Sequence, residues 1–573
     1  MSSETSLTFD KFSNKLKVPY VIFADFECLN RSTEDSLHTS TTYTHEYAEH
    51  KPSRFSLCVV DSSKKNLICR EVYRGESCVE VFFERINEHS KRLLKCLREI
   101  VPLFPLTSEQ FKEFSNAQCC HICEKKFSNP YDKVIDHDHQ TGLFRGPAHS
   151  DCNINFKHKK KIPIVFHNFR GYDSHLIIQG FEKFNGKVKI IATNSEKYLS
   201  IICDNFYFLD SMMVLNASLD SLVQNLHSKN DFKGSFWYLI KAMGEKKAKL
   251  LSRKGVYCYD YINSFSKFKE KKFPSSDAFI NSLTGENVSV EDYNYGKTIF
   301  TKYCETLGDY HDIYLQTDTA LLACVFENFR DLSIETYQLD PLHYFSLAGL
   351  AWDASLKFSK VKLDLLTDID MYNMLNSSMR GGISTIITRF AQANNHYMTN
   401  YDENHDDSYL FYIDKNNSYG EALCEMLPHF NTESILKLID DSDDGYIFEV
   451  DLDYPTKLHE THDQYPLAAD SLVVQNENLS IFQMQLISNL TIKYNSRQSK
   501  LIPHLGKRTY YVVHYRNLKY YLKKGFTNIC VTQCLVNRLK IFITEKKINS
   551  EKPRRSMDGI LIVAGKVLNK SIY

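Results

Sequence analysis

A short apolar stretch near the amino terminus, residues 18–27, constrains the fold most. Its β-branched and aromatic residues favour a strand, which ends in two acids, Asp25 and Glu27. Side chains two positions apart in a strand point to the same face, so both carboxylates would project from one face. Two neighbouring acids are costly to bury unless a cation lies between them. This stretch alone fits two interpretations equally well: an exposed strand end with two solvated acids, or a metal site.

The length of the chain bounds its organisation. At 573 residues it is too long for one hydrophobic core and should form several domains. Its 70 basic and 70 acidic residues give no net charge, so a surface that binds a polyanion must be local. Some of the 35 Tyr and 37 Phe could stack on bases, but most should fill cores.

Cysteine usage indicates a reducing compartment. The chain has 16 Cys, begins with a polar stretch and contains no apolar run long enough to span a membrane. We therefore expect mostly free, buried thiols and no membrane partner. We expect an intracellular location, in the nucleus if DNA is the partner.

Residues 119–153 differ from the rest of the chain because cysteine and histidine are concentrated there. Cys120 with Cys123, and His149 with Cys152, are pairs separated by two residues, which is the spacing of zinc ligands. A Cys3His set suits a closed tetrahedral structural site, and the segment is too small to form its own core. Structural zinc is therefore favoured over free thiols beside surface histidines.

Two more acids, Asp173 and Asp318, lie in segments that are expected to form helices. Asp173 follows an expected strand at 162–167 and starts a helix, which fits either an exposed functional side chain or a helix cap. Tyr314 and Asp318 lie four apart on an amphipathic helix and share one face, as in a common surface hydrogen bond. Apolar periodicity also predicts strands at 55–60 and 207–210 and helices at 79–101 and from 218.

In order along the chain, these motifs resemble the three exonuclease motifs of family B DNA polymerases. The matching residues are Asp25 and Glu27, then Asn168, Tyr172 and Asp173, then Tyr314 and Asp318. The resemblance implies an RNase H-like 3′-5′ exonuclease domain acting on single-stranded DNA. Its four carboxylates would hold two divalent cations, Mg²⁺ or Mn²⁺, about 4 Å apart, and Tyr314 would orient the water.

Later segments resemble the protein-primed branch of that family, of the Polinton/Maverick and linear-plasmid type. The segments are residues 168–173, 218–222, 350–357, 379–384 and 412–420. The resemblance implies a partial polymerase palm that binds primer-template DNA. The implied contacts are Ser218 and Leu219 to the primer end, Arg380, Gly381 and Gly382 to template, Asp414 to the catalytic cations and Tyr419 to the incoming nucleotide.

The cysteine-rich segment resembles phage endonuclease VII, a His-Asn nuclease with a ββα-metal fold. The resemblance would make His137 a general base, with Asp136 and Asn153 holding a cation. The acid that the phage enzymes carry three residues after the asparagine is replaced here by Phe156. We therefore favour a structural or DNA-contacting insert over a second active nuclease.

The expected polymerase site is incomplete. Neither the second palm aspartate motif nor the triphosphate-binding helix of the family is found in this sequence, and the resemblance fades after about residue 526. We therefore expect a C-terminally truncated polymerase that does not extend primers. The chain would use dNTPs only if that site were complete. The sequence does not decide whether a terminal protein is a partner.

The predicted fold class is α/β, with several domains. The expected parts are the exonuclease in two pieces, 1–118 and 161–335, a zinc insert at 119–160, a partial palm at 336–525 and a basic tail at 526–573. Three functions follow. They are a DNA-directed DNA polymerase by resemblance with an intact exonuclease site, a stand-alone metal-dependent 3′-5′ exonuclease, and a non-catalytic zinc-stabilised DNA-binding remnant.

Overall fold

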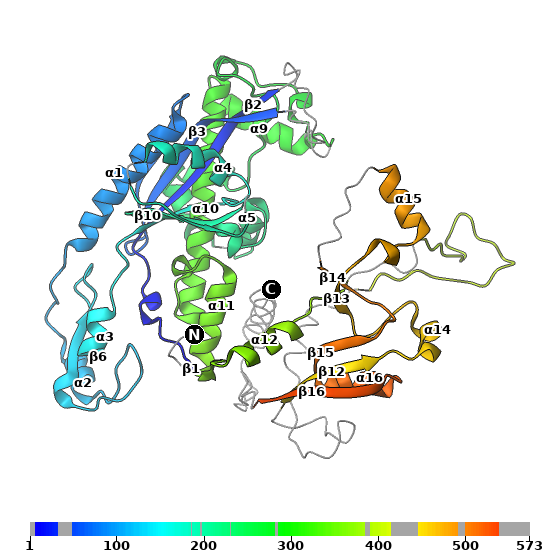
Figure 1. Ribbon diagram of the computed structural model, residues 1–573. Coiled ribbons are helices and arrows are strands. Elements are labelled where there is room, and N and C mark those ends of the chain that lie inside the picture. Colours follow the sequence, from blue (N-terminus) through cyan, green and yellow to red (C-terminus); the bar gives the residue numbers. More distant parts are fainter. Residues whose placement is uncertain are drawn as a thin grey trace. The chain divides into compact units, whose positions relative to one another are not determined.

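The structure is a computed structural model, and its chain divides into two units, Asp10–Ala354 and Met1–Phe9 with Ser355–Tyr573 (Figure 1). It describes residues 6–32, 48–184, 186–194, 197–229, 231–280, 285–383, 390–413, 445–490 and 499–537. None of the helices in these ranges is long and apolar enough to cross a lipid bilayer.

A mixed sheet of seven strands forms the framework of the larger unit. In spatial order its strands are β4 (Asn66–Arg74), β3 (Ala48–Asp61), β2 (Tyr20–Ser32), β7 (Ile162–Phe166), β10 (Phe206–Asp210), β9 (Tyr198–Ile202) and β8 (Lys189–Ala192). The central strands β2, β7 and β10 run parallel, whereas the strands on both sides pair antiparallel. The strands predicted at 162–167 and 207–210 are confirmed to within one residue, and those predicted at 18–27 and 55–60 are confirmed but longer, since β2 continues to Ser32 and β3 begins at Ala48.

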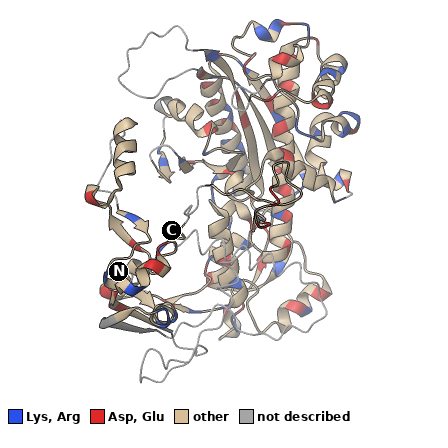
Figure 2. Cartoon of the chain, turned by 90° about the vertical axis from the view of Figure 1, so that its right-hand side faces the viewer, with Lys and Arg blue, Asp and Glu red and all other residues tan. Residues whose placement is uncertain are grey.

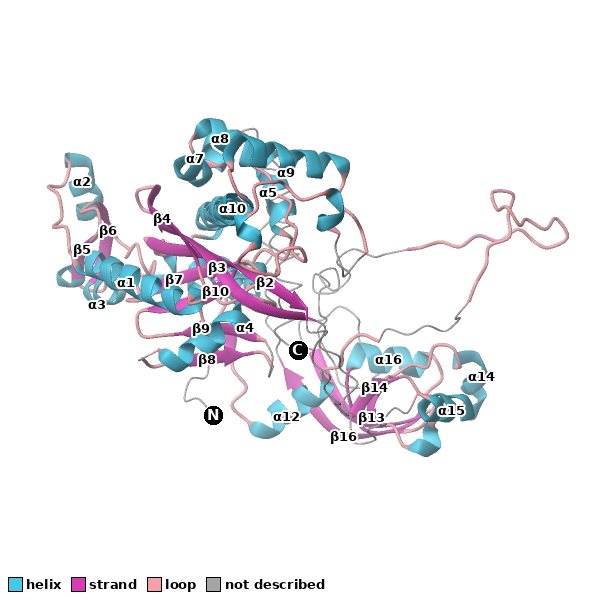
Figure 3. Ribbon diagram, turned by 90° about the horizontal axis from the view of Figure 1, so that it is seen from above, coloured by secondary structure: helices cyan, strands magenta, loops and turns pink. Residues whose placement is uncertain are grey.

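Helices cover both faces of this sheet, which is why β2 is apolar on both sides. Ile22, Ala24 and Phe26 face a core with α1 (Cys78–Arg98) and α4 (Asp173–Ile178). Val21 and Phe23 face a core with α5 (Leu219–His227), α7 (Trp237–Met243) and α10 (Leu307–Tyr337) (Figure 3). Asp25 and Glu27 continue the alternation of Val21 and Phe23, so their carboxylates lie on the α10 side.

The long helix α10 is joined to the start of β2 through a buried arginine. Arg330 donates to both carboxylate oxygens of Asp340, at 3.0 and 2.6 Å, and to the carbonyl oxygen of Val18 at 2.8 Å. Asp340 in turn accepts from the Val18 N–H at 2.7 Å. Residues beyond 335, the predicted end of the exonuclease, therefore still belong to the larger unit, which reaches Ala354.

Residues 119–156 form a small subdomain, drawn in cyan in Figure 1. Strands β5 (Lys133–His137) and β6 (Phe144–His149) pair antiparallel and are followed by α3 (Ser150–Asn155), the ββα order that the resemblance implied. Its core is completed by Leu16 from the chain start. The segment therefore packs against the residues that lead into β2.

The smaller unit contains a three-stranded antiparallel sheet. Its order is β15 (Arg508–His514), β12 (Gly445–Asp453) and β16 (Thr527–Asn537). The predicted basic tail therefore begins with a strand, because β16 pairs along the length of β12. Asp414 and Tyr419 lie outside the described residues, so the polymerase palm stays a prediction.

Further helices and strands complete the two units. In the larger unit they include α2 (Ser108–Asn116), α6 (Phe232–Ser235), α8 (Glu245–Leu251), α9 (Val290–Tyr303) and the 3-10 helix η1 (Phe12–Lys15). In the smaller unit they include β1 (Ser6–Leu7), β11 (Leu363–Asp364), α12 (Ile369–Ser378), α14 (His459–His462), β13 (Asp470–Val473), α15 (Ile481–Asn489), β14 (Ser499–Ile502) and α16 (Tyr515–Lys523). Helix α11 (Leu347–Ser359) crosses the boundary between the units.

Candidate functional site

Four carboxylates from three elements share one site in the larger unit. Asp25 and Glu27 come from β2, Asp173 from the first turn of α4 and Asp318 from the middle of α10. The Phe26 N–H donates to Asp173 Oδ1 at 3.3 Å, which places α4 directly beside β2. Glu27, Asp173 and Asp318 are buried and Asp25 is half-buried.

The electrostatics of this site follow from burial and crowding. Burial, followed by repulsion from Asp318, raises the pKa of Asp25 to about 7. Burial and the charge of Asp25 also raise the pKa values of Glu27 and Asp173 well above their ordinary values. Asp25, Glu27 and Asp173 therefore cannot all be ionised without positive charge nearby.

The donor set fits a hard divalent cation. All four side chains offer carboxylate oxygens, the ligand type that such cations prefer. Asp318 Oδ1 is buried and has no hydrogen-bond partner among the described residues, so a ligand position is available there. The resemblance predicted the same four acids. In the structure Asp25 acts electrostatically on each of the other three, and their role as cation ligands stays a prediction.

One cation at this site comes from the protein itself. Lys254 Nζ lies 2.9 Å from Asp318 Oδ2 and 5.7 Å from the ring centre of Tyr314. Burial acts to lower the pKa of Lys254, but the charge of Asp318, the hydrogen bond to it and the charge of Asp25 outweigh burial and raise that pKa. Lys254 is therefore a charged ammonium that partly neutralises the four acids.

Three tyrosines line the site next to Lys254. The hydroxyls of Tyr314 and Tyr259 are 2.8 Å apart, and Tyr257 stacks on Tyr314 with ring centres 4.9 Å apart. Burial raises the pKa values of all three phenols, which stay protonated and available for hydrogen bonding. Lys254, Tyr257 and Tyr259 were missed in the sequence because they lie in an irregular segment without periodicity.

The second predicted motif forms the turn that leads into α4. Asn168 has a left-handed backbone, with φ of 71°, and its N–H donates to Asp210 Oδ1 at 3.0 Å. A Cβ on Gly171 would lie too close to Asn168 Oδ1, so any larger residue there would displace the Asn168 side chain. The Tyr172 hydroxyl bonds to His50 Nδ1 at 3.0 Å, and His50 is a further neighbour that the sequence did not indicate.

The other residues predicted to contact DNA make contacts within the protein. The Ser218 hydroxyl caps α5 by accepting from the Ser221 N–H, and Leu219 is buried in the core beneath. In the smaller unit, Arg380 lies over the Tyr511 ring and donates to the Val512 carbonyl at 2.6 Å. Contacts of Ser218, Leu219, Arg380, Gly381 and Gly382 to DNA therefore stay predictions.

The predicted zinc ligands form a cluster. The ligand atoms of Cys120, Cys123, His149 and Cys152 all lie within 4.8 Å of one another. His149 Nδ1 is 3.4 Å from Cys123 Sγ and 3.9 Å from Cys152 Sγ. His149 Nε2 lies 3.3 Å from the Lys126 carbonyl, an acceptor that directs Nδ1 toward the sulfurs. This donor set fits structural zinc.

The predicted second nuclease residues lie in the same subdomain. The buried Asp136 carboxylate accepts from Arg145 at 2.8 Å and bonds to His121 at 2.9 Å. Burial would raise the pKa of Asp136, but these two partners lower it overall. His137 lies at the end of β5 and Asn153 in α3. Because Arg145 and His121 already engage the Asp136 carboxylate, the geometry favours a structural role for Asp136.

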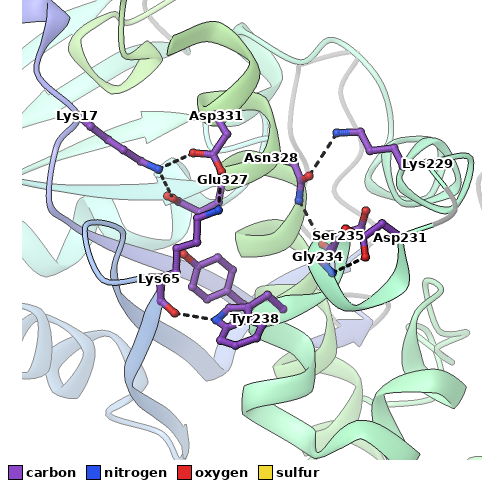
Figure 4. Close-up of a pocket in the computed structure, with 11 residues that line it drawn as sticks. Lys17, Lys65, Lys229, Asp231, Gly234, Ser235, Tyr238, Glu327, Asn328 and Asp331 are labelled. Atoms are coloured by element: carbon purple, nitrogen blue, oxygen red, sulfur yellow. Dashed lines mark hydrogen bonds and ion pairs between the residues drawn. The ribbon is translucent and has the colours of Figure 1, made fainter. Parts of the chain in front are cut away.

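The larger unit also has a cavity of about 300 Å³ away from the carboxylates (Figure 4). Lys17 Nζ lies 2.5 Å from Asp331, and Lys229 donates to Asn328 at 3.3 Å. Glu327 also lies 4.0 Å from Lys17. Lys17 and Lys65 thus pair with acids of the cavity wall, and Lys229 and Asp231 are held by Asn328 and the Gly234 N–H, which favours a structural interpretation.

Comparison with known proteins identifies one part of the chain. Residues 99–172 match the recombination endonuclease VII family, which confirms the resemblance of the cysteine-rich segment. No curated protein sequence matches the chain. Neither comparison supports a family B polymerase. The matched segment holds the Cys3His cluster and indicates a domain that processes or binds DNA.

Proposed function

We propose that the larger unit is a metal-dependent 3′-5′ DNA exonuclease with a zinc-stabilised, endonuclease VII-like insert. The observation that carries this proposal is that Asp25, Glu27, Asp173 and Asp318 lie within electrostatic reach of Asp25, with three of them buried and Asp25 half-buried. These acids are separated by up to nearly 300 residues, and burying them together is costly unless the site binds cations. The mixed sheet with helices on both faces supports an RNase H-like domain.

The chemistry of such a site is phosphodiester hydrolysis. Bound Mg²⁺ or Mn²⁺ would supply a nucleophilic water and stabilise charge on the leaving oxygen. Asp25, Glu27, Asp173 and Asp318 would hold these cations. The protein adds the ammonium of Lys254, placed to offset negative charge, and the paired hydroxyls of Tyr314 and Tyr259, placed to orient a water or a phosphate oxygen.

The insert has a separate role in this proposal, namely to contact DNA. Lys157 and Lys160 are exposed directly after α3. Elsewhere in the larger unit, acidic and basic residues are interspersed (Figure 2). A local basic segment next to a zinc-stabilised domain suits contacts to phosphates, which weaken as salt rises. Asp136, His137 and Asn153 would then support the subdomain.

A relation to protein-primed family B DNA polymerases is the second candidate. The order of the three carboxylate motifs along the chain, now found in one site, favours that relation. It would assign the smaller unit to a partial palm, with Arg380, Gly381 and Gly382 near template, Asp414 at the cations and Tyr419 at the nucleotide. Template-directed incorporation of dNTPs by this chain would establish it.

The direct test uses labelled DNA. With Mg²⁺ or Mn²⁺, we expect 5′-labelled single-stranded DNA to give a ladder that shortens from its 3′ end, and a blocked 3′ end to stop it. A circular single strand has no end, so it should stay intact. Linearisation of the circle would instead assign cleavage to the insert. Salt-sensitive binding without any cleavage would support the non-catalytic alternative.

The titration of Asp25 predicts a pH dependence of stability. Its pKa is about 7 when folded, against an ordinary 3.8. Between these values the folded state holds a proton that the unfolded state has released, so the free energy of unfolding falls as pH rises. In chelator, the melting temperature of the wild type should drop relative to Asp25→Asn between pH 5 and pH 8. Parallel melting curves across this range would show that Asp25 titrates normally.

Replacing Lys254 should raise the affinity of the site for Mg²⁺ but lower the rate of hydrolysis. Lys254→Met removes a charge that competes with a cation for Asp318 but also stabilises developing negative charge. We expect a lower Mg²⁺ concentration for half-maximal activity and a rate at saturating Mg²⁺ that falls about 100-fold. Lys254→Arg should restore part of the rate, and Lys249→Met, an exposed lysine on α8, should change neither quantity. A raised Mg²⁺ requirement for Lys254→Met would contradict the competition.

A further inference from the structure

Three metal-binding side chains meet at the edge of the seven-stranded sheet, outside both sites described above. Cys69 and Glu71 lie two apart on the edge strand β4 and so share a face. His89 faces them from α1, which packs over this part of the sheet. One ligand atom from each of the three residues lies within 4.8 Å of the other two.

The distances suit a common metal ion. His89 Nε2 lies 2.7 Å from Glu71 Oε1 and 3.9 Å from Cys69 Sγ. The second value equals the separation of Cys152 Sγ and His149 Nδ1 in the Cys3His cluster. Tetrahedral zinc needs donors about 3.4 to 3.6 Å apart, so these two separations would have to change by about 0.3 to 0.7 Å.

The three side chains differ in their exposure to solvent, as expected for a partly open metal site. The His89 ring is buried, which fixes its position, whereas Cys69 and Glu71 are half-buried and can be reached from solvent. The guanidinium of Arg92 lies 3.3 Å from His89 Nδ1 and is exposed. It can therefore turn outward when Nδ1 carries the proton and Nε2 binds a metal.

We propose that Cys69, Glu71 and His89 form a second zinc site, with water in the fourth ligand position. One sulfur, one nitrogen and one carboxylate oxygen select a borderline-soft cation such as Zn²⁺ over Mg²⁺. The site links the edge strand β4 to α1. It is chemically distinct from the four-carboxylate site, which offers oxygen alone, and it does not depend on the function proposed there.

Zinc stoichiometry of the full chain tests this proposal. The protein is loaded with Zn²⁺ in excess Mg²⁺, so that the carboxylates hold the hard cation, then desalted and measured by plasma mass spectrometry. We expect about two zinc ions per chain. Cys69→Ser and His89→Gln should each lower the number to about one. Cys96→Ser, a matched cysteine on α1 outside the cluster, should leave it at about two.

The absorption spectrum of bound Co²⁺ distinguishes the two proposed zinc sites. It also provides a second test if a variant folds poorly. In a chain carrying Cys123→Ser and Cys152→Ser, bound Co²⁺ should still give a thiolate-to-cobalt absorption band in the near ultraviolet. Adding Cys69→Ser should remove that band. One zinc per wild-type chain, or a cobalt band unchanged by Cys69→Ser, would overturn the proposal.

Discussion

The substitution Asp318→Asn is expected to lower the rate of 3′-5′ degradation of single-stranded DNA at least about 100-fold. Asp318 is buried in α10, and its Oδ1 is free of hydrogen bonds among the described residues, so a bound cation would use that oxygen. Loss of residues that only orient metal ligands costs about 10- to 100-fold, and loss of a ligand should cost more. The measurement is the single-turnover rate on 5′-labelled DNA across a Mn²⁺ titration.

The matched control lies on the same helix. Glu335→Gln changes an exposed acid of α10 far from the site and should keep the wild-type rate. DNA binding by Asp318→Asn should persist, because the change removes negative charge near the phosphates. An unchanged rate for both Asp318→Asn and Asp25→Ala would show that the four carboxylates are not the nuclease centre.

Removing zinc from the Cys3His cluster is expected to unfold residues 119–156. Structural zinc contributes about 10 to 16 kcal/mol in zinc-finger peptides, which equals or exceeds the total stability of most domains. The core of this segment is small and includes three of the ligands, Cys120, Cys123 and Cys152. Cys123→Ser with Cys152→Ser should therefore open it to proteases, with the first cuts between residues 119 and 160.

The remaining fold should withstand that loss. The two cores on either side of the seven-stranded sheet are built from residues outside 119–156. Cys119→Ser changes an exposed neighbour of the ligands and should leave the cleavage pattern unaltered. Protease resistance of the double variant equal to that of the wild type would show that zinc does not hold this segment together.

The sequence predicted the central strands because each is a continuous apolar run bounded by polar residues. Apolar periodicity also predicted the helix at 79–101, and α1 buries Phe82 and Ile86 from that periodic set. Motif order allowed the four acids to be grouped, which periodicity alone could not do. The structure disfavours an exposed strand end for Asp25 and Glu27, since Glu27 is buried, Asp25 is half-buried and both are influenced by the charge of Asp318; the metal site is the function proposed for them.

Several features could not be read from the sequence. Lys254 and Tyr259 lie in an irregular segment and reach the acids only through tertiary packing. Cys69 and His89 belong to different elements, and their contact depends on how α1 lies across β4. Strand β16 was missed because its pairing with β12 connects residues more than 70 positions apart.

The bond between Arg330 and Val18 has a consequence for protein synthesis. These residues are 312 positions apart, so at about 5 to 20 residues per second the first strand waits roughly 15 to 60 s for its partner. During that interval the apolar residues of β2 lack α10, which covers one of their two faces. A nascent chain stalled before α10 would expose this strand to aggregation, and binding by ribosome-associated chaperones would protect it.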